Sequence, residues 1–191
     1  MADFFLEESF DPPLAGASER TMMRALDSCL RHGDWRECFL DRDRRRMLCR
    51  FEALDAHALY RTSPCASFAS GALWAGTIYS PPPAGRDGHG SHDRLSDLIG
   101  EKDFDAPMPQ SDLVELARSC TWCFEFHRVQ LVRLFLSHNG RRAIALFRAP
   151  DAESVRLAYQ RAGTPLDRVW RCRRIGSGDR TRIENTAAAP G

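Results

Sequence analysis

Residues 3–10 have the pattern of a β-strand, with Phe4 and Leu6 on one face and Phe5 and Glu7 on the other. Apolar residues then recur at helical spacing over about 18–31, and a hairpin is predicted at 35–51 around a polar turn. A short helix beginning near residue 55 and a strand at 73–79 follow. These elements make up the first half of the chain.

The same succession of patterns returns in the second half. A strand is predicted at 98–104, and Ser111 can cap the helix that follows it. A hairpin is predicted around Asn139-Gly140, because Asn-Gly is the strongest short hairpin signal. Asp151 can cap a second helix, and 168–175 is the last predicted strand.

The two halves are copies of one unit. Phe39-Leu40 returns as Phe135-Leu136, 96 positions later, and Trp74 returns as Trp170 at the same offset. Near the start of each half the offset is 94, and Glu7 corresponds to Glu101. Paired blocks that recur at two nearly equal offsets indicate a duplication with a short insertion or deletion in a loop.

Each half therefore has the ferredoxin-like order β-α-β-β-α-β, which gives an antiparallel sheet with helices on one face. Residues 143–147 are apolar on both faces, so the face without helices must also be covered. We predict an α+β fold in which two ferredoxin-like repeats pack sheet to sheet as a single-chain dimeric α+β barrel. The predicted divisions are repeat 1 at 1–80, a Pro/Gly/His linker at 81–96, repeat 2 at 97–175 and a disordered tail at 176–191.

Composition narrows the classes of partner. A formal net charge of +1 does not indicate binding to nucleic acid or to a membrane surface. The 7 cysteines are scattered without a disulfide framework, which favours reduced thiols, and the N-terminus has no signal-peptide pattern. We expect a cytoplasmic protein, either a monomer with an intrachain pseudo-dimer or a homodimer.

Several segments resemble a bacterial ferredoxin-like family of largely unknown function, whose best-known members are small nickel-binding proteins. The runs 147–155 and 161–169 carry the resemblance in the second half. In the first half, 5–10 looks like the family's first strand, and Met47-Leu48-Cys49-Arg50-Phe51 looks like its third, where a Cys is common.

The resemblance covers about residues 3–79 and 97–175 and implies binding of nickel or another transition metal. Nickel-binding relatives tend to carry a His just after the second helix. This chain has Thr164 at that position in the second half and, by the repeat offset, Phe68 in the first.

Three residues are the predicted metal ligands: Glu7, Glu101 and Cys49. A carboxylate in mid-strand that faces away from the helices could bind a cation or a proton between the sheets. The alternative is a strand-edge Glu in water. The basic neighbours Arg46 and Arg50 could favour a Cys49 thiolate, and the alternative for Cys49 is a small buried hydrophobe.

Other candidate groups have simpler explanations. Cys120 and Cys123 have the spacing of a metal or redox motif, but a structural zinc site needs a second ligand pair, so core packing is favoured. Arg141-Arg142 could clamp an anion, although charged hairpin ends also protect sheet edges.

The favoured function is a small-ligand-binding protein whose ligand could be nickel, another transition metal or a small molecule. One alternative is a cofactor-independent α+β-barrel enzyme, monooxygenase- or isomerase-like, that uses the cavity between the sheets. Another is a structural or partner-binding duplicate without a site. The chain contains neither a Gly-rich phosphate loop nor a nucleophile elbow. The enzyme is the less favoured of these functions.

Overall fold

The computed structural model describes residues 1–15, 21, 33–55, 71–81 and 95–176. The predicted helices at 18–31 and near 55, most of the predicted linker and nearly all of the predicted tail lie outside these residues. The chain divides into two compact units. The first is Met1–Ala75 with Arg173–Gly191, and the second is Gly76–Cys172.

The first unit is built around a central antiparallel strand. β3 (Arg46–Ala53) pairs with β1 (Ala2–Ser9) on one side and with β2 (Gly33–Asp41) on the other. Side chains on one face of these strands form an apolar core that includes Leu6, Trp35 and Phe51. The strands therefore lie where the alternating pattern of the sequence predicts them.

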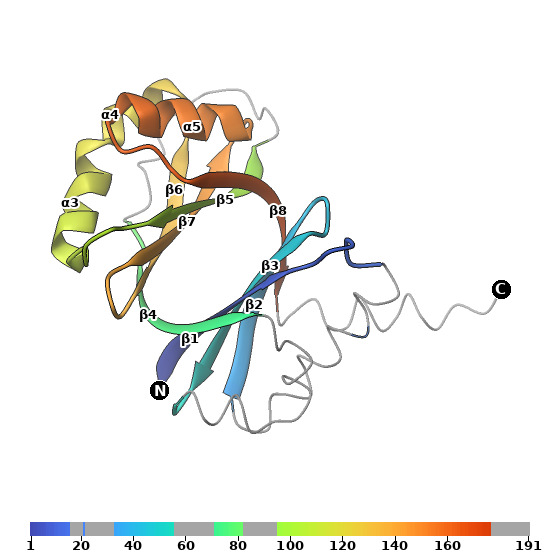
Figure 1. The fold of residues 1–191 in the computed structure, drawn as a ribbon. Helices are drawn as coiled ribbons and strands as arrows, with labels where there is room; N and C mark the ends of the chain where they lie inside the picture. Colours follow the sequence, from blue (N-terminus) through green and yellow to red (C-terminus); the bar gives the residue numbers. More distant parts are fainter. Residues whose placement is uncertain (16–20, 22–32, 56–70, 82–94, 177–191) are drawn as a thin grey trace. The chain divides into compact units, whose positions relative to one another are not determined.

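The second unit has the same central arrangement, with helices over one face of its sheet (Figure 1). β7 (Arg142–Ala149) pairs with β5 (Ser96–Asp103) and β6 (Gln130–Ser137). The helices are α3 (Gln110–Ser119), α4 (Thr121–Phe126) and α5 (Ala152–Arg161).

Two further strands cross the boundary between the units. These are β4 (Ala72–Tyr79) and β8 (Arg168–Gly176). Within the second unit, the end of β4 pairs with β6 and the start of β8 pairs with β5.

The hydrogen-bonding order of the strands corrects the predicted fold class. The order is β1-β3-β2-β8-β5-β7-β6-β4, and it closes into one eight-stranded barrel. The prediction of two ferredoxin-like sheets packed sheet to sheet is therefore wrong. The last strand of each half does not end a sheet of its own, because β4 lies between β1 and β6 and β8 lies between β2 and β5. Closure leaves none of the described strands at an open sheet edge, which removes the hazard of edge-to-edge association.

Irregularities in the strands repeat between the halves. The register of β2 against β3 shifts between Trp35 and Glu37, and that of β6 against β7 shifts between Leu131 and Arg133. These two pairs of residues are 96 positions apart. A β-bulge redirects the side chains that follow it, so the duplication preserved backbone geometry as well as apolar pattern.

The two hairpin turns are also equivalent. Arg44 has φ 56° and Gly140 has φ 68°, and both carbonyls accept a backbone hydrogen bond, from Leu14 at 2.9 Å and from Met108 at 2.8 Å. A Cβ on Gly140 would lie 2.9 Å from the Met108 carbonyl oxygen. Glycine is therefore required in the second half, whereas the first half holds an arginine in the left-handed region.

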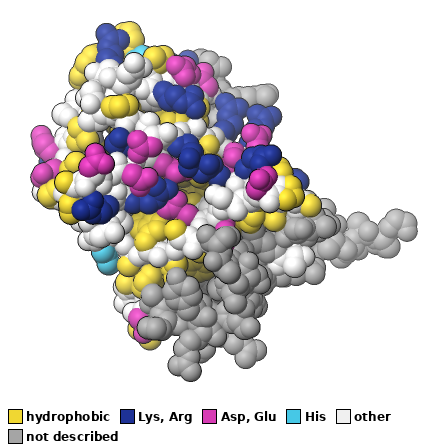
Figure 2. Space-filling view, in the orientation of Figure 1, with side chains coloured by type: hydrophobic (Ala, Val, Ile, Leu, Met, Phe, Trp, Pro, Cys, Tyr) yellow, Lys and Arg dark blue, Asp and Glu magenta, His cyan; other side chains and the backbone are white. Residues whose placement is uncertain are grey.

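Both faces of β7 are buried, as the sequence predicts, since Ile144 and Leu146 are as inaccessible as Ala145 and Phe147. On the surface drawn in Figure 2, basic and acidic side chains are interspersed, in keeping with the small net charge. Within the part of the chain that the structure describes, no helix has the length and apolar character needed to cross a membrane.

Candidate functional site

The second unit contains a cavity of about 310 Å³ between its sheet and its helices. The sheet contributes small residues to its floor, and the helices contribute apolar walls. The lining residues are Gly100, Lys102, Phe104, Met108, Leu113, Leu116, Ala117, Cys120, Phe124, Leu134, Ala143, Ala145, Tyr159, Gly163, Thr164, Pro165 and Leu166. The sequence prediction placed a cavity between two sheets, whereas this cavity lies on the helix-covered face.

Small side chains on neighbouring strands create this space. Gly100 on β5 lies opposite Ala145 on β7 in the strand register, and Ala143 is the next residue on the same face of β7. A Cβ on Gly100 would lie 2.8 Å from both Leu166 and Phe147. Glycine at this position therefore lets Leu166 and Phe147 pack closely against the backbone of β5.

Asp167 ties the segment 163–166 to β5 at the edge of the cavity. Its backbone N–H donates to the Glu101 carbonyl at 3.0 Å. Its carboxylate accepts from the Asp103 backbone N–H at 2.6 Å and from Lys102 Nζ at 3.1 Å. Burial acts to raise the pKa of Asp167, but these hydrogen bonds and the Lys102 charge outweigh burial, and the net pKa is lowered.

Two ionisable side chains that line the cavity, Cys120 and Tyr159, are held neutral. Burial raises the pKa of the Cys120 thiol and outweighs an opposing hydrogen bond with Ser119, and nearby Cys123 adds to the rise. Burial also raises the pKa of the Tyr159 phenol, although part of that residue remains exposed, and a charge on Cys120 would add to the effect. A neutral phenol and a neutral thiol are weak bases and weak nucleophiles, so these groups favour binding over acid–base or nucleophilic chemistry.

One polar atom at the cavity has no partner. Thr164 lines the cavity, and its buried hydroxyl oxygen makes no hydrogen bond with any of the described residues. A buried hydroxyl without a partner is uncommon in a folded protein, since each such group loses its hydrogen bonds to water. This threonine occupies the position at which the resembled family tends to carry a His.

The two predicted glutamate ligands each hydrogen-bond to a tryptophan. Trp74 Nε1 donates to Glu7 Oε1 at 2.6 Å, and Trp170 Nε1 donates to Glu101 Oε1 at 2.6 Å. Glu101, which is 5 % exposed, also accepts from Arg142 at 2.9 Å and from Arg168 at 3.3 Å. The alternative of a solvated strand-edge glutamate does not apply to Glu101, because arginine and indole groups surround its carboxylate.

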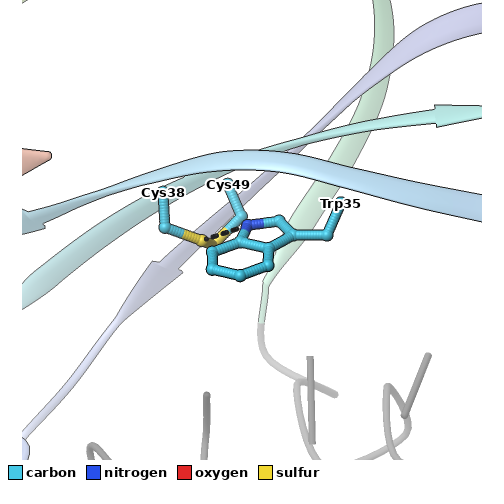
Figure 3. The surroundings of a disulfide bond; sticks show 3 residues. All are labelled: Trp35, Cys38 and Cys49. Atoms are coloured by element: carbon cyan, nitrogen blue, oxygen red, sulfur yellow. Dashed lines mark hydrogen bonds between the residues drawn. A yellow bond between two sulfur atoms is a disulfide. The ribbon is translucent and has the colours of Figure 1, made fainter. Parts of the chain in front are cut away.

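Cys49 lies in a disulfide, which corrects the expectation that this thiol is reduced. Its partner is Cys38, directly opposite on β2, at a Cα–Cα distance of 4.1 Å. Trp35 Nε1 donates to Cys38 Sγ at 3.1 Å, and the indole lies beside the sulfur pair (Figure 3). A sulfur in a disulfide supplies no thiolate, so Cys49 has no metal-ligand role in this state.

No group of three or more His, Cys, Asp or Glu side chains is placed to hold a metal ion among the described residues. Metal binding through Glu7 and Glu101 stays a prediction from sequence, and Cys49 could take part in it only as a reduced thiol. Cys120 and Cys123 are free and buried, as core packing predicts. Arg142 binds Glu101 and Asp103 within the protein, so these carboxylates already occupy its guanidinium.

No protein-family model matches the chain, and no curated protein matches it. Among solved structures, the chain is similar to an anthrone oxidase-like protein, with 7 % identity, a TM-score of 0.49 and coverage of 93 % of this chain and 94 % of that one. It is also similar to a heme-binding protein from Thermus thermophilus, with 9 % identity, a TM-score of 0.44 and coverage of 96 % and 95 %. Likenesses at this level assign no activity to the chain.

Proposed function

We propose that the second unit binds a small, largely apolar organic molecule in the cavity between its sheet and helices. The observation that carries this proposal is the cavity itself, about 310 Å³ in volume and lined mainly by aliphatic and aromatic side chains. Ligand pockets in proteins span roughly 300–1,000 Å³, so this cavity suits a compact ligand. Transfer of apolar ligand surface from water into such a pocket supplies the driving force for binding.

The polar groups around the cavity also support binding rather than catalysis. Cys120 and Tyr159 are held neutral, and the Lys102 ammonium is paired with Asp167. A cofactor-independent enzyme would need a base or nucleophile that is active near neutral pH. A binding protein needs only an apolar surface and a few orienting contacts.

The test is titration with a neutral fluorescent probe, N-phenyl-1-naphthylamine, on the full chain. We expect saturable binding with one probe per chain. Ala145→Leu, which adds bulk to the cavity floor, and Ala117→Leu, which adds bulk to the helical wall, should each weaken probe binding at least about tenfold.

Ala106→Leu is the matched control, because Ala106 is exposed and does not line the cavity. This variant should bind the probe as the parent protein does. Circular dichroism spectra of all variants confirm that the fold is retained. Absence of saturable binding in the parent protein, or equal binding by both cavity variants in their folded state, would contradict the proposal.

A further inference from the structure

We infer that the cavity selects an uncharged ligand carrying one hydrogen-bonding group, and that Thr164 is the residue that recognises this group. The inference rests on the proposed function and names the ligand class for the same cavity. It depends on two independent observations, the partnerless hydroxyl of Thr164 and the pairing of the charged side chain that lines the cavity.

The backbone holds Thr164 at a defined place against the cavity. The Thr164 N–H donates to the Tyr159 carbonyl at 3.0 Å, just after Gly163, whose φ of 76° ends α5. Asp167 fixes the other end of this short segment to β5. Since both ends are anchored, a ligand would meet this side chain in a position that differs little between the empty and the bound protein.

The hydroxyl of Thr164 can gain a hydrogen-bond partner when a ligand enters. Its oxygen is buried and has no hydrogen bond among the described residues. Rotation about χ1 exchanges the places of a threonine hydroxyl and methyl group between staggered positions. A ligand hydroxyl or carbonyl beside Thr164 would therefore satisfy an atom that the empty cavity leaves unsatisfied.

Charge in the cavity is already compensated. Lys102 is the one charged side chain among the lining residues, and its ammonium lies 3.1 Å from Asp167 Oδ1. An anionic ligand would have to share this cation with Asp167, and a cationic ligand would find no lining carboxylate. Burial of an unpaired charge is strongly unfavourable, so both classes of charged ligand are disfavoured.

The test compares naphthalene, 2-naphthol and 2-naphthoate as competitors of N-phenyl-1-naphthylamine on the full chain. The parent protein should bind 2-naphthol about five- to tenfold more tightly than naphthalene, the size of one neutral hydrogen bond. Thr164→Val keeps the side-chain shape and removes the hydroxyl, so it should abolish this preference. Thr164→Ser keeps the hydroxyl and should retain the preference. 2-Naphthoate should bind at least about tenfold more weakly than 2-naphthol.

The results separate this inference from the proposed function. Equal affinity of the parent protein for naphthalene and 2-naphthol, or an unchanged preference in Thr164→Val, would overturn the role of Thr164 while the cavity still binds ligand. Affinity for 2-naphthoate equal to that for 2-naphthol would overturn the selection for uncharged ligands. Failure of the fluorescent probe and all three competitors to bind would overturn the proposed function as well.

Discussion

The indole Nε1 of Trp170 donates a hydrogen bond to Oε1 of Glu101 at 2.6 Å. The first half of the chain repeats this contact, since Trp74 donates to Glu7 at 2.6 Å. Each tryptophan lies on the last strand of its half and each glutamate on the first. The duplication therefore retained a hydrogen bond between two distant parts of each repeat, as well as the strand pattern.

Loss of this hydrogen bond should lower the free energy of unfolding more in the second half than in the first. Trp170→Phe removes the donor to a carboxylate that is 5 % exposed, and a hydrogen bond to a charged group contributes about 1.5–3 kcal/mol. Trp74→Phe should cost less, because Glu7 is more exposed and water can replace the indole. Urea unfolding of the two matched variants measures both costs. Equal losses, or a loss below about 0.5 kcal/mol in Trp170→Phe, would contradict the prediction.

The sequence predicts this contact better than it predicts a metal site. Glu7 and Glu101 recur at nearly the same offset as Trp74 and Trp170, so the repeat marks both partners of each hydrogen bond. The metal hypothesis considered the glutamates together with Cys49 and left out the tryptophans. A paired recurrence of a donor and an acceptor is the signal that indicates their contact.

Local structure in the second half was predictable in part. The predicted cap at Ser111 is wrong, because α3 begins at Gln110 after Pro109 and has no side-chain cap hydrogen bond. Asp151 caps α5 and Asn139-Gly140 forms the turn between β6 and β7, because caps and turns depend on a few adjacent residues. Barrel closure was not predictable in this way. Alternation shows which face of a strand is buried, but it does not show which strand lies beside it.

The cavity and the disulfide differ in how far sequence could predict them. The cavity arises from Gly100, Ala143 and Ala145, and small residues in strands are too common to mark a site by themselves. Cys38 and Cys49, however, lie on the two predicted strands of one hairpin, and the register of β2 against β3 pairs them. The hairpin pattern therefore indicates that the two cysteines lie on neighbouring antiparallel strands, while the register that places them directly opposite comes from the structure.

The Cys38–Cys49 disulfide should stabilise the first unit. It closes a loop with a sequence separation of 11. For a loop of this length, the loss of chain entropy in the unfolded state predicts a stabilisation of about 2–3 kcal/mol. The double variant Cys38→Ala/Cys49→Ala should lose about this much in urea unfolding without reductant. Peptide mapping after alkylation of the native protein should recover the two cysteines in one cross-linked species. Complete alkylation of Cys38 and Cys49 in protein unfolded without reductant would contradict the pairing.

The N-terminus of α5 should depend on the Asp151 side chain. Its Oδ1 accepts from the Ser154 backbone N–H at 2.8 Å, and this hydrogen bond is the main cause of its lowered pKa. Asp151→Ala should destabilise the protein by about 1 kcal/mol, and Asp151→Asn should retain most of the stability because an amide oxygen also caps a helix. Thermal unfolding of both variants provides the comparison. Equal losses in the two variants would show that charge, rather than capping, is the larger effect.

Asp167 should make both stability and ligand binding sensitive to acid. Its pKa in the folded protein is lowered, so its contribution to stability is present above the unfolded value of about 3.9 and is lost as the pH falls through the folded value. The side chain is 47 % exposed, so the contribution at neutral pH should be below about 1 kcal/mol. Asp167→Asn keeps the size of the side chain but puts an amide against the Lys102 ammonium and the Asp103 N–H. Its stability deficit should therefore shrink below about pH 4.

The same variant tests whether Asp167 holds the wall of the cavity. With the segment 163–166 less firmly tied to β5, Asp167→Asn should bind N-phenyl-1-naphthylamine about two- to fivefold more weakly at pH 7, because part of the binding energy must then order the wall. Asp105→Asn, at an exposed residue that does not line the cavity, controls for the loss of one negative charge. A stability deficit in Asp167→Asn that stays constant from pH 7 to pH 3 would show that the carboxylate does not titrate with folding. Probe affinity equal to that of the control would show that the carboxylate does not order the cavity.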